Sequence, residues 1–146
     1  MDKNIQALHH VAIIVQDMEK SLKFYRDVLG LKFLKDYTNR GPVADETLGL
    51  VDASQRICLL CAGSDEILIE LCQYYSPAGC PQMPNIQEND IGVRHLCFQV
   101  GNIQAIYERL GKAGIKFTSK PIVQASGATC VFFRDPDGNS LEFIQV

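Results

Sequence analysis

The chain has 146 residues, of which 47% are hydrophobic and 21% are charged, and its formal net charge is −3. This is the composition of an ordinary globular protein, which argues against a disordered chain and against a basic nucleic-acid-binding protein. No apolar run approaches the roughly 20 residues that cross a bilayer, and the first ten residues lack the apolar core of a signal peptide. We therefore expect a cytoplasmic protein that binds a small molecule, with neither nucleic acid nor a membrane as partner.

The chain contains six cysteines. In the absence of an export signal, we interpret them as reduced, small, buried side chains and not as a disulfide framework. The one C-x-x-C motif joins Cys58 to Cys61 within a strand-like run, where positions i and i+3 point to opposite faces. It is therefore a poor metal or dithiol site.

The first predicted element is a strand over residues 8–15 that is apolar on both faces. Strand alternation places His9 and His10 on opposite faces, with His10 beside Ala12 and Ile14. Asp17 then has the position of a helix N-cap and Gly30 that of a helix stop. Between them apolar residues recur at helical spacing, at Met18, Leu22, Tyr25 and Leu29. Three strand-like segments follow, at residues 31–35, 57–61 and 67–72.

The second half of the chain shows the same order of elements. A strand from residue 93 to 100 leads to Asn102 as N-cap, a helix that Gly114 ends, and strands at residues 116–118, 129–133 and 140–146. The sequences "AGSDE" and "RDPDGN" have the composition of hairpin turns. We therefore interpret Asp135, Asp137 and Gly138 as turn-forming residues and not as catalytic ones.

The two halves align with each other in matched blocks. Residues 8–33 correspond to 93–117 with a slip of one residue in the helix, and residues 57–73 correspond to 129–145 without a gap. We infer a duplicated unit of strand, helix and three strands. The first copy is longer between residues 33 and 57, where Gly, Pro and Asp predict a surface loop or lid.

The alignment pairs His10 with His95 and Glu70 with Glu142. Each glutamate lies in an apolar strand, where a buried carboxylate without a partner is costly to ionise. Two neutral imidazoles and two carboxylates balance the charge of a divalent cation, so the set is suited to Zn, Ni, Fe, Mn or Co if the two copies face a shared cavity. The structural alternative is a pair of hydrogen-bonded core histidines and exposed glutamates on edge strands. His9 is expected on the side of the helix or at the strand margin, as a structural or half-exposed residue.

Four segments, "LHHVAIIVQDMEKSLKFYRDVLGLK", "ILIELCQYYSP", "GVRHLCFQVGNI" and "FFRDPDGNSLEFIQ", resemble the vicinal oxygen chelate superfamily. This superfamily includes glyoxalase I, methylmalonyl-CoA epimerase, extradiol dioxygenases and the fosfomycin- and bleomycin-resistance proteins. The resemblance implies an α+β fold of two tandem βαβββ modules whose curled mixed sheets enclose a metal cavity. It implies one glyoxalase-like domain over residues 1–146, with module one at about 6–76, a linker at about 77–91 and module two at about 92–146.

Matched motif by motif, the resemblance implies four ligands of one divalent metal ion: His10, Glu70, His95 and Glu142. A metal-dependent lyase or isomerase of the glyoxalase I type is then expected, in which the ion chelates two neighbouring oxygens of the substrate as a Lewis acid. Glu142 or Glu70 is expected to move the proton as general base, and the repeat leaves the choice open. The alternatives are a ring-cleaving dioxygenase of the extradiol type, with two histidines and one glutamate, and a ligand-binding resistance protein without the metal set.

The chain departs from the family pattern where a thiol cofactor would be held. The arginine expected four residues after the first histidine is Ile14, and the asparagine expected four residues after the first glutamate is Tyr74, which argues against glutathione. No cluster of Lys or Arg suggests a site for a CoA phosphate. Members of the family commonly dimerise, so a homodimer is expected.

Overall fold

The computed structural model describes residues 5–63, 67–81 and 86–146. The chain forms two compact units, Met1–Cys80 and Pro81–Val146, and the boundary falls in the segment that the sequence predicts as a linker. None of the described helices is long and apolar enough to cross a membrane.

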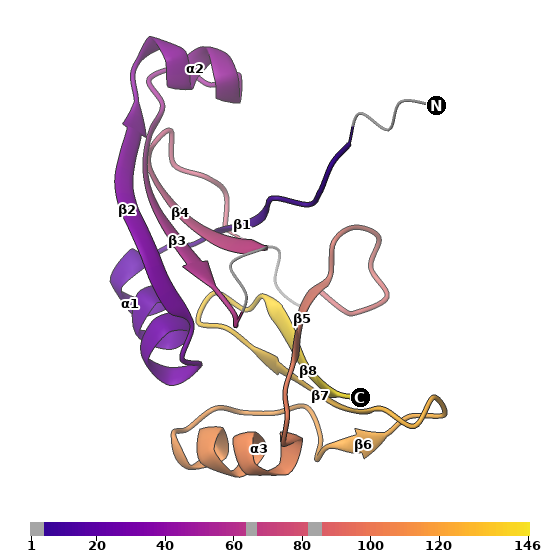
Figure 1. The fold of residues 1–146 in the computed structure, drawn as a ribbon. Helices are drawn as coiled ribbons and strands as arrows, with labels where there is room; N and C mark the ends of the chain where they lie inside the picture. The colour runs from indigo at the N-terminus through magenta and orange to yellow at the C-terminus, as the bar shows by residue number, and fades with distance from the viewer. Residues whose placement is uncertain (1–4, 64–66, 82–85) are drawn as a thin grey trace. The chain divides into compact units, whose positions relative to one another are not determined.

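The first unit contains one mixed sheet of four strands in the order β1-β4-β3-β2. Strand β1 (His10–Ile14) runs parallel to β4 (Leu68–Ser76), while β3 (Ser54–Cys61) is antiparallel to both β4 and β2 (Lys32–Arg40). The helical segment between β1 and β2 consists of α1 (Met18–Leu22) and the π-helical turn η1 (Lys23–Val28) (Figure 1). A parallel pair needs such a crossover, because a tight turn can join only antiparallel strands.

The second unit has the same topology, with the sheet order β5-β8-β7-β6. Strand β5 (His95–Gln99) is parallel to β8 (Ser140–Gln145), and β7 (Thr129–Arg134) is antiparallel to both β8 and β6 (Ile122–Val123). Helix α3 (Ile103–Lys112) connects β5 to the rest of the sheet. The predicted tandem βαβββ architecture with mixed sheets is therefore confirmed.

Each sheet has one face that is more exposed than the other. In β1 the residues His10, Ala12 and Ile14 are exposed and alternate with Val11 and Ile13, which are at least half-buried. In β5 the exposed residues are His95, Cys97 and Gln99. We call the face that carries these side chains the open face of each unit. Apolar side chains fill the other side, among them Leu60, Leu71 and Tyr25 in the first unit and Phe133, Leu141 and Leu110 in the second.

The segment predicted as a loop or lid is largely regular structure. Strand β2 continues to Arg40 and pairs with β3 as far as Ser54, so that the hairpin is longer than the sequence suggests. Helix α2 (Pro42–Leu48) lies at the end of this hairpin (Figure 1), with Pro42 in its first turn and Gly49 in the left-handed conformation at its end. The prediction of a loop was wrong for the first part of this segment, because Tyr37 and Thr38 pair with Ile57 and Arg56 in the ladder.

The short strand predicted at residues 116–118 is also displaced. Phe117 makes only an isolated bridge to Phe133, and the regular strand β6 begins after Pro121. The Phe117 ring packs 4.7 Å from Tyr107 and 5.5 Å from Phe133, measured between ring centroids. Aromatic packing against the helix, and not a continuous ladder, therefore fixes this segment.

The two predicted helix caps are confirmed. The Asp17 carboxylate accepts a hydrogen bond from Lys20 N at 3.1 Å, and the Asn102 side chain accepts one from Ala105 N at 2.9 Å. Gly30 and Gly114 end the two helical segments with φ of 85° and 90°, a backbone conformation that favours glycine. The first segment is one residue longer between cap and glycine, and it contains the π-helical turn, in which Leu29 N donates to Phe24 O five residues back. The wider turn accommodates the extra residue.

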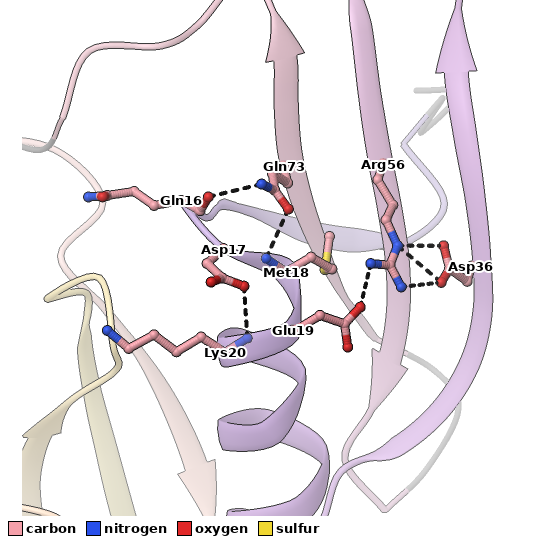
Figure 2. Close-up of polar contacts among 8 residues, drawn as sticks. All are labelled: Gln16, Asp17, Met18, Glu19, Lys20, Asp36, Arg56 and Gln73. Carbon is pink, nitrogen blue, oxygen red and sulfur yellow. Dashed lines mark hydrogen bonds and ion pairs between the residues drawn. The ribbon is translucent and has the colours of Figure 1, made fainter.

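Equivalent glutamines join the last strand of each unit to the start of its helix. Gln73 in β4 accepts a hydrogen bond from Met18 N at 2.9 Å and donates one to Gln16 O at 3.0 Å (Figure 2). Gln145 in β8 accepts a hydrogen bond from Ile103 N at 2.8 Å. Because the first N–H groups of a helix have no partner within it, each glutamine satisfies a donor that the helix itself leaves unpaired.

A charged cluster joins the same helix start to β2 and β3. Arg56 in β3 contacts Glu19 at 2.6 Å and Asp36 in β2 at 2.7 Å, and its guanidinium forms a fork on the Asp36 carboxylate (Figure 2). This hydrogen bond lowers the pKa of Asp36 below its usual range, against the opposing effect of burial. The cluster therefore holds the first helical turn against the long hairpin.

We expect Gln73→Ala to lower the free energy of unfolding by about 1–3 kcal/mol, because it removes the acceptor for the N–H of the buried Met18. Urea denaturation followed by circular dichroism measures this loss. The control is Gln99→Ala, at an exposed position of β5. Equal stability of the two variants would contradict the assigned role of Gln73.

We also expect the Asp36 cluster to make stability depend on acid. The folded carboxyl has a pKa below its ordinary value of 3.8, so its contribution is complete at higher pH and is lost as pH falls through the lowered pKa. Wild type should therefore lose stability between pH 5 and pH 2.5 more steeply than Asp36→Asn, as thermal melting at several pH values would show. The control is Asp52→Asn, which removes the same charge from an exposed position of the same unit. Parallel curves for wild type and Asp36→Asn would contradict this role.

Candidate metal centre

The second unit brings together one histidine and one glutamate of the predicted ligand set. His95 Nε2 lies 3.3 Å from Glu142 Oε2. The two residues come from the neighbouring parallel strands β5 and β8, where Cys97 pairs with Glu142 and His95 pairs with Ser140. Both side chains therefore project from the open face. The His95 side chain is 39% exposed and that of Glu142 only 13%.

The spacing of these two atoms suits two neighbouring ligands of one ion. A tetrahedral ion with ligand bonds of about 2.0–2.1 Å places adjacent donor atoms about 3.3 Å apart. The measured separation has this value, and the donors are an imidazole nitrogen and a carboxylate oxygen. The pair is thus a suitable half of a divalent metal site, and the same geometry also permits a hydrogen bond between the two side chains.

Thiols surround the Glu142 carboxylate. Burial, followed by a hydrogen bond to Glu142, raises the pKa of Cys97 to about 12, and the same two causes raise the pKa of Cys130. Both thiols are therefore protonated at neutral pH and serve as weak donors to the carboxylate. They are not nucleophiles in this state, because nucleophilic attack requires the thiolate.

The first unit repeats this arrangement on its own open face. Ala12 pairs with Glu70 across β1 and β4, which places His10 and Glu70 on the same side of the sheet. Cys72 Sγ donates a hydrogen bond to Glu70 Oε1 at 3.3 Å, and burial together with Glu70 raises the pKa of Cys72 to about 12. Each predicted ligand glutamate therefore has a protonated thiol beside it.

His9 does not lie on the opposite side from His10, contrary to the prediction from strand alternation. Nδ1 of His9 is 2.9 Å from Nδ1 of His10, and the two rings meet edge to face with centroids 5.2 Å apart. The prediction of opposite faces was wrong because β1 begins at His10, so the alternation of the strand does not extend to His9; the predicted position at the strand margin agrees with this start. One nitrogen of the pair donates and the other accepts, which leaves Nε2 of His10 free of this contact.

Two tyrosines near Glu70 were not predicted as site residues. Burial, followed by the charge of Glu70, raises the pKa of Tyr37, and burial with Cys72 and Glu70 raises that of Tyr74. Both phenols therefore stay neutral and can donate hydrogen bonds. Lys35 Nζ lies 4.9 Å from the centroid of the Tyr37 ring, a cation–π distance. Tyr74 shares the parity of Glu70 in β4, so strand alternation could have indicated it; Tyr37 lies in the extension of β2 that the sequence did not reveal.

Glu88 is a third residue near the site that was not predicted from the sequence. Its Oε2 lies 3.6 Å from His95 Nδ1, and its Oε1 lies 2.9 Å from Arg134 Nη2 and 2.5 Å from Ser140 Oγ. It belongs to the segment predicted as a linker, which carries no periodic pattern.

Two of the four predicted ligands thus lie on the open face of each unit. Within the described ranges of the chain, no group of three or more His, Cys, Asp or Glu side chains is placed so as to hold a metal ion. Glu70 and Glu142, the predicted bases, both lie in central strands and are half-buried.

The chain is similar to known proteins along nearly its whole length. The model of the Glyoxalase/Bleomycin resistance protein/Dioxygenase superfamily matches residues 7–143. A probable lactoylglutathione lyase of Synechocystis is 30% identical over 143 residues, covering 94% of each chain. A 2-epi-5-epi-valiolone epimerase of an Actinomyces species is 29% identical over 153 residues, covering 96% of this chain and 79% of that one.

The fold is shared with a solved structure. The crystal structure of a glyoxalase family protein from Bacillus cereus has a TM-score of 0.89 and covers 99% of this chain and 97% of its own. Its sequence identity is 20%, so this likeness concerns the fold alone. With the paired βαβββ units and the family match over residues 7–143, the chain belongs to the Glyoxalase/Bleomycin resistance protein/Dioxygenase superfamily.

Proposed function

We propose that the protein is a metal-dependent lyase or isomerase of the glyoxalase type. Its substrate is a small carbonyl or thioester-type compound with two neighbouring oxygens. The observation that carries the proposal is the His95–Glu142 pair at 3.3 Å, on an open face whose counterpart in the first unit carries His10 and Glu70. The lactoylglutathione lyase and epimerase names of its relatives support the same class of reaction.

The proposed ligand set is His10, Glu70, His95 and Glu142, and the ion is one of Zn, Ni, Fe, Mn or Co. When bound, the ion supplies Lewis-acid stabilisation of the negative charge that develops on the substrate oxygens. The two carboxylates and two neutral imidazoles leave the loaded set without net charge, which suits half-buried positions.

Proton transfer falls to Glu142 or Glu70. One carboxylate removes a proton from the carbon next to the carbonyl. Isomerisation results if the same group returns the proton to the neighbouring carbon, and epimerisation results if the other carboxyl group delivers a proton to the opposite face of the same carbon. The thiols of Cys97 and Cys72 orient the two carboxylates by hydrogen bonding and stay protonated themselves. Tyr37 and Tyr74, as neutral phenols, can donate hydrogen bonds to a substrate oxygen near Glu70.

Glutathione is a poor candidate for the thiol part of the substrate. Ile14 is 52% exposed on the open face of the first unit, where an arginine would be needed for a glutathione carboxylate. An apolar side chain cannot form the charged hydrogen bonds that such a carboxylate requires. Epimerisation of a compound without glutathione is therefore the second candidate, and the similarity to the valiolone epimerase favours it.

We expect the reconstituted protein to bind one divalent ion per chain, as measured by elemental analysis after dialysis. His95→Ala and Glu142→Ala should each weaken Zn²⁺ binding beyond the roughly 10–100-fold that changes outside the ligand shell cause. The control is Glu108→Ala, which removes the same charge from the exposed side of α3. Two ions per chain, or binding unchanged in both variants, would contradict the four-ligand proposal.

We expect turnover to exchange a substrate proton with solvent, because a carboxylate base mediates the step. Reactions in D₂O with hemithioacetal, thioester and ketone substrates, followed by NMR, detect this exchange. Oxygen uptake with catechols under the same conditions would instead favour the ring-cleaving dioxygenase.

We also propose a homodimer, which sedimentation analysis tests.

A further inference from the structure

Glu88 occupies a defined position beside a proposed ligand, although it lies between β4 and β5, outside the strands and helices of both units. Two groups hold one of its oxygens: Arg134 Nη2 and Ser140 Oγ both contact Oε1. The other oxygen, Oε2, faces His95 Nδ1 at 3.6 Å. The Glu88 side chain is 41% exposed, so burial does not explain its orientation. The two contacts to Oε1 fix the carboxylate and direct Oε2 at the imidazole.

The His95 ring therefore lies between two carboxylates. Its Nε2 is 3.3 Å from Glu142 and its Nδ1 is 3.6 Å from Glu88, while the Phe132 ring packs against it edge to face at 5.1 Å. A neutral imidazole carries one proton, and only the nitrogen without it can bind a metal. The position of this proton therefore decides whether Nε2 can bind a metal beside Glu142.

Two arrangements compete for this proton. If it lies on Nε2, His95 donates to Glu142 and cannot act as a ligand there; if it lies on Nδ1, the carboxylate of Glu88 stabilises it. The separation of 3.6 Å between Glu88 Oε2 and His95 Nδ1 is longer than a good hydrogen bond. In the metal-free protein Glu88 therefore acts on the imidazole mainly through its charge. Ligand histidines commonly present their second nitrogen to a carboxylate, which fixes the tautomer and the ring orientation.

We propose that Glu88 is a positioning residue for His95: it holds the proton on Nδ1 and so presents the lone pair of Nε2 beside Glu142. Arg134 and Ser140 support the role indirectly by fixing the Glu88 carboxylate. The metal-binding consequence rests on the proposed function, whereas the effect on the tautomer does not.

The test uses ¹⁵N NMR of the imidazole rings in metal-free full-length protein at a pH where His95 is neutral. The Nδ1–H tautomer of His95 should have a larger share in wild type than in Glu88→Ala, where the population should shift toward the Nε2–H tautomer. Glu88→Asp, which keeps the carboxylate, should restore part of the Nδ1–H form. Glu108→Ala, with the same loss of charge elsewhere in the unit, should leave the spectrum of His95 unchanged. The same tautomer populations in wild type and in Glu88→Ala would overturn the proposal.

A second measurement follows Zn²⁺ affinity by competition with a chromophoric chelator. Glu88→Ala should weaken binding about 10–100-fold, and Glu88→Asp should recover part of the loss. If wild type binds no metal while the tautomer still shifts in Glu88→Ala, the metal-dependent function fails and the positioning role stands. If metal binds equally in wild type and Glu88→Ala, the positioning role is overturned and the metal-dependent function stands.

Discussion

The last strand of each unit is bonded to the first turn of its helix through a glutamine, and this connection sets the positions of both layers. Gln73 and Gln145 each accept a hydrogen bond from a helix N–H, at 2.9 Å and 2.8 Å. The same strands are the central ones in their sheets, with a parallel neighbour on one side and an antiparallel neighbour on the other. Three residues before each glutamine stands a proposed ligand, Glu70 or Glu142. An odd spacing in a strand sends the two side chains to opposite faces, so one strand fixes the helix on one side and presents a carboxylate on the other.

The polar chemistry of the open faces follows from how these carboxylates are stabilised. Neither glutamate is fully exposed, and neither lies in apolar surroundings without a donor: Cys72 contacts one, and Cys97 and Cys130 contact the other. A thiol is a weak donor that compensates only part of the cost of burying a charge. The carboxylates therefore keep capacity for a stronger partner, which is what a cation with open coordination positions would provide.

Alternation and capping in the sequence were sufficient to predict the duplicated order of elements, the two N-caps, and the face on which His10 and His95 lie. The predictions that were wrong concern positions where a regular pattern ends. His9 lies just outside β1, and its side chain is set by contact with His10 instead of by the pleat. The extended β2–β3 hairpin is stabilised by pairing between residues that are 14 to 22 positions apart in the sequence, from Arg40 with Ser54 to Asp36 with Cys58, and local periodicity does not reveal such pairs. Glu88 bonds to Ser140, 52 residues along the chain, and nothing in the intervening segment indicates this contact.

The π-helical turn at Lys23–Val28 has a consequence for how the two copies have diverged. One copy has a helical segment longer by one residue, yet the cap and the terminating glycine keep equivalent structural roles in both. An insertion in a strand would have reversed the facing of every side chain beyond it, including the ligand positions. Placed in the helix, the same insertion changes only the pitch of one turn. Differences in length between the two copies thus fall in the helix and in the end of the hairpin that carries α2. The strands with proposed ligands, β1, β4, β5 and β8, can therefore keep their register and the face on which the ligands lie.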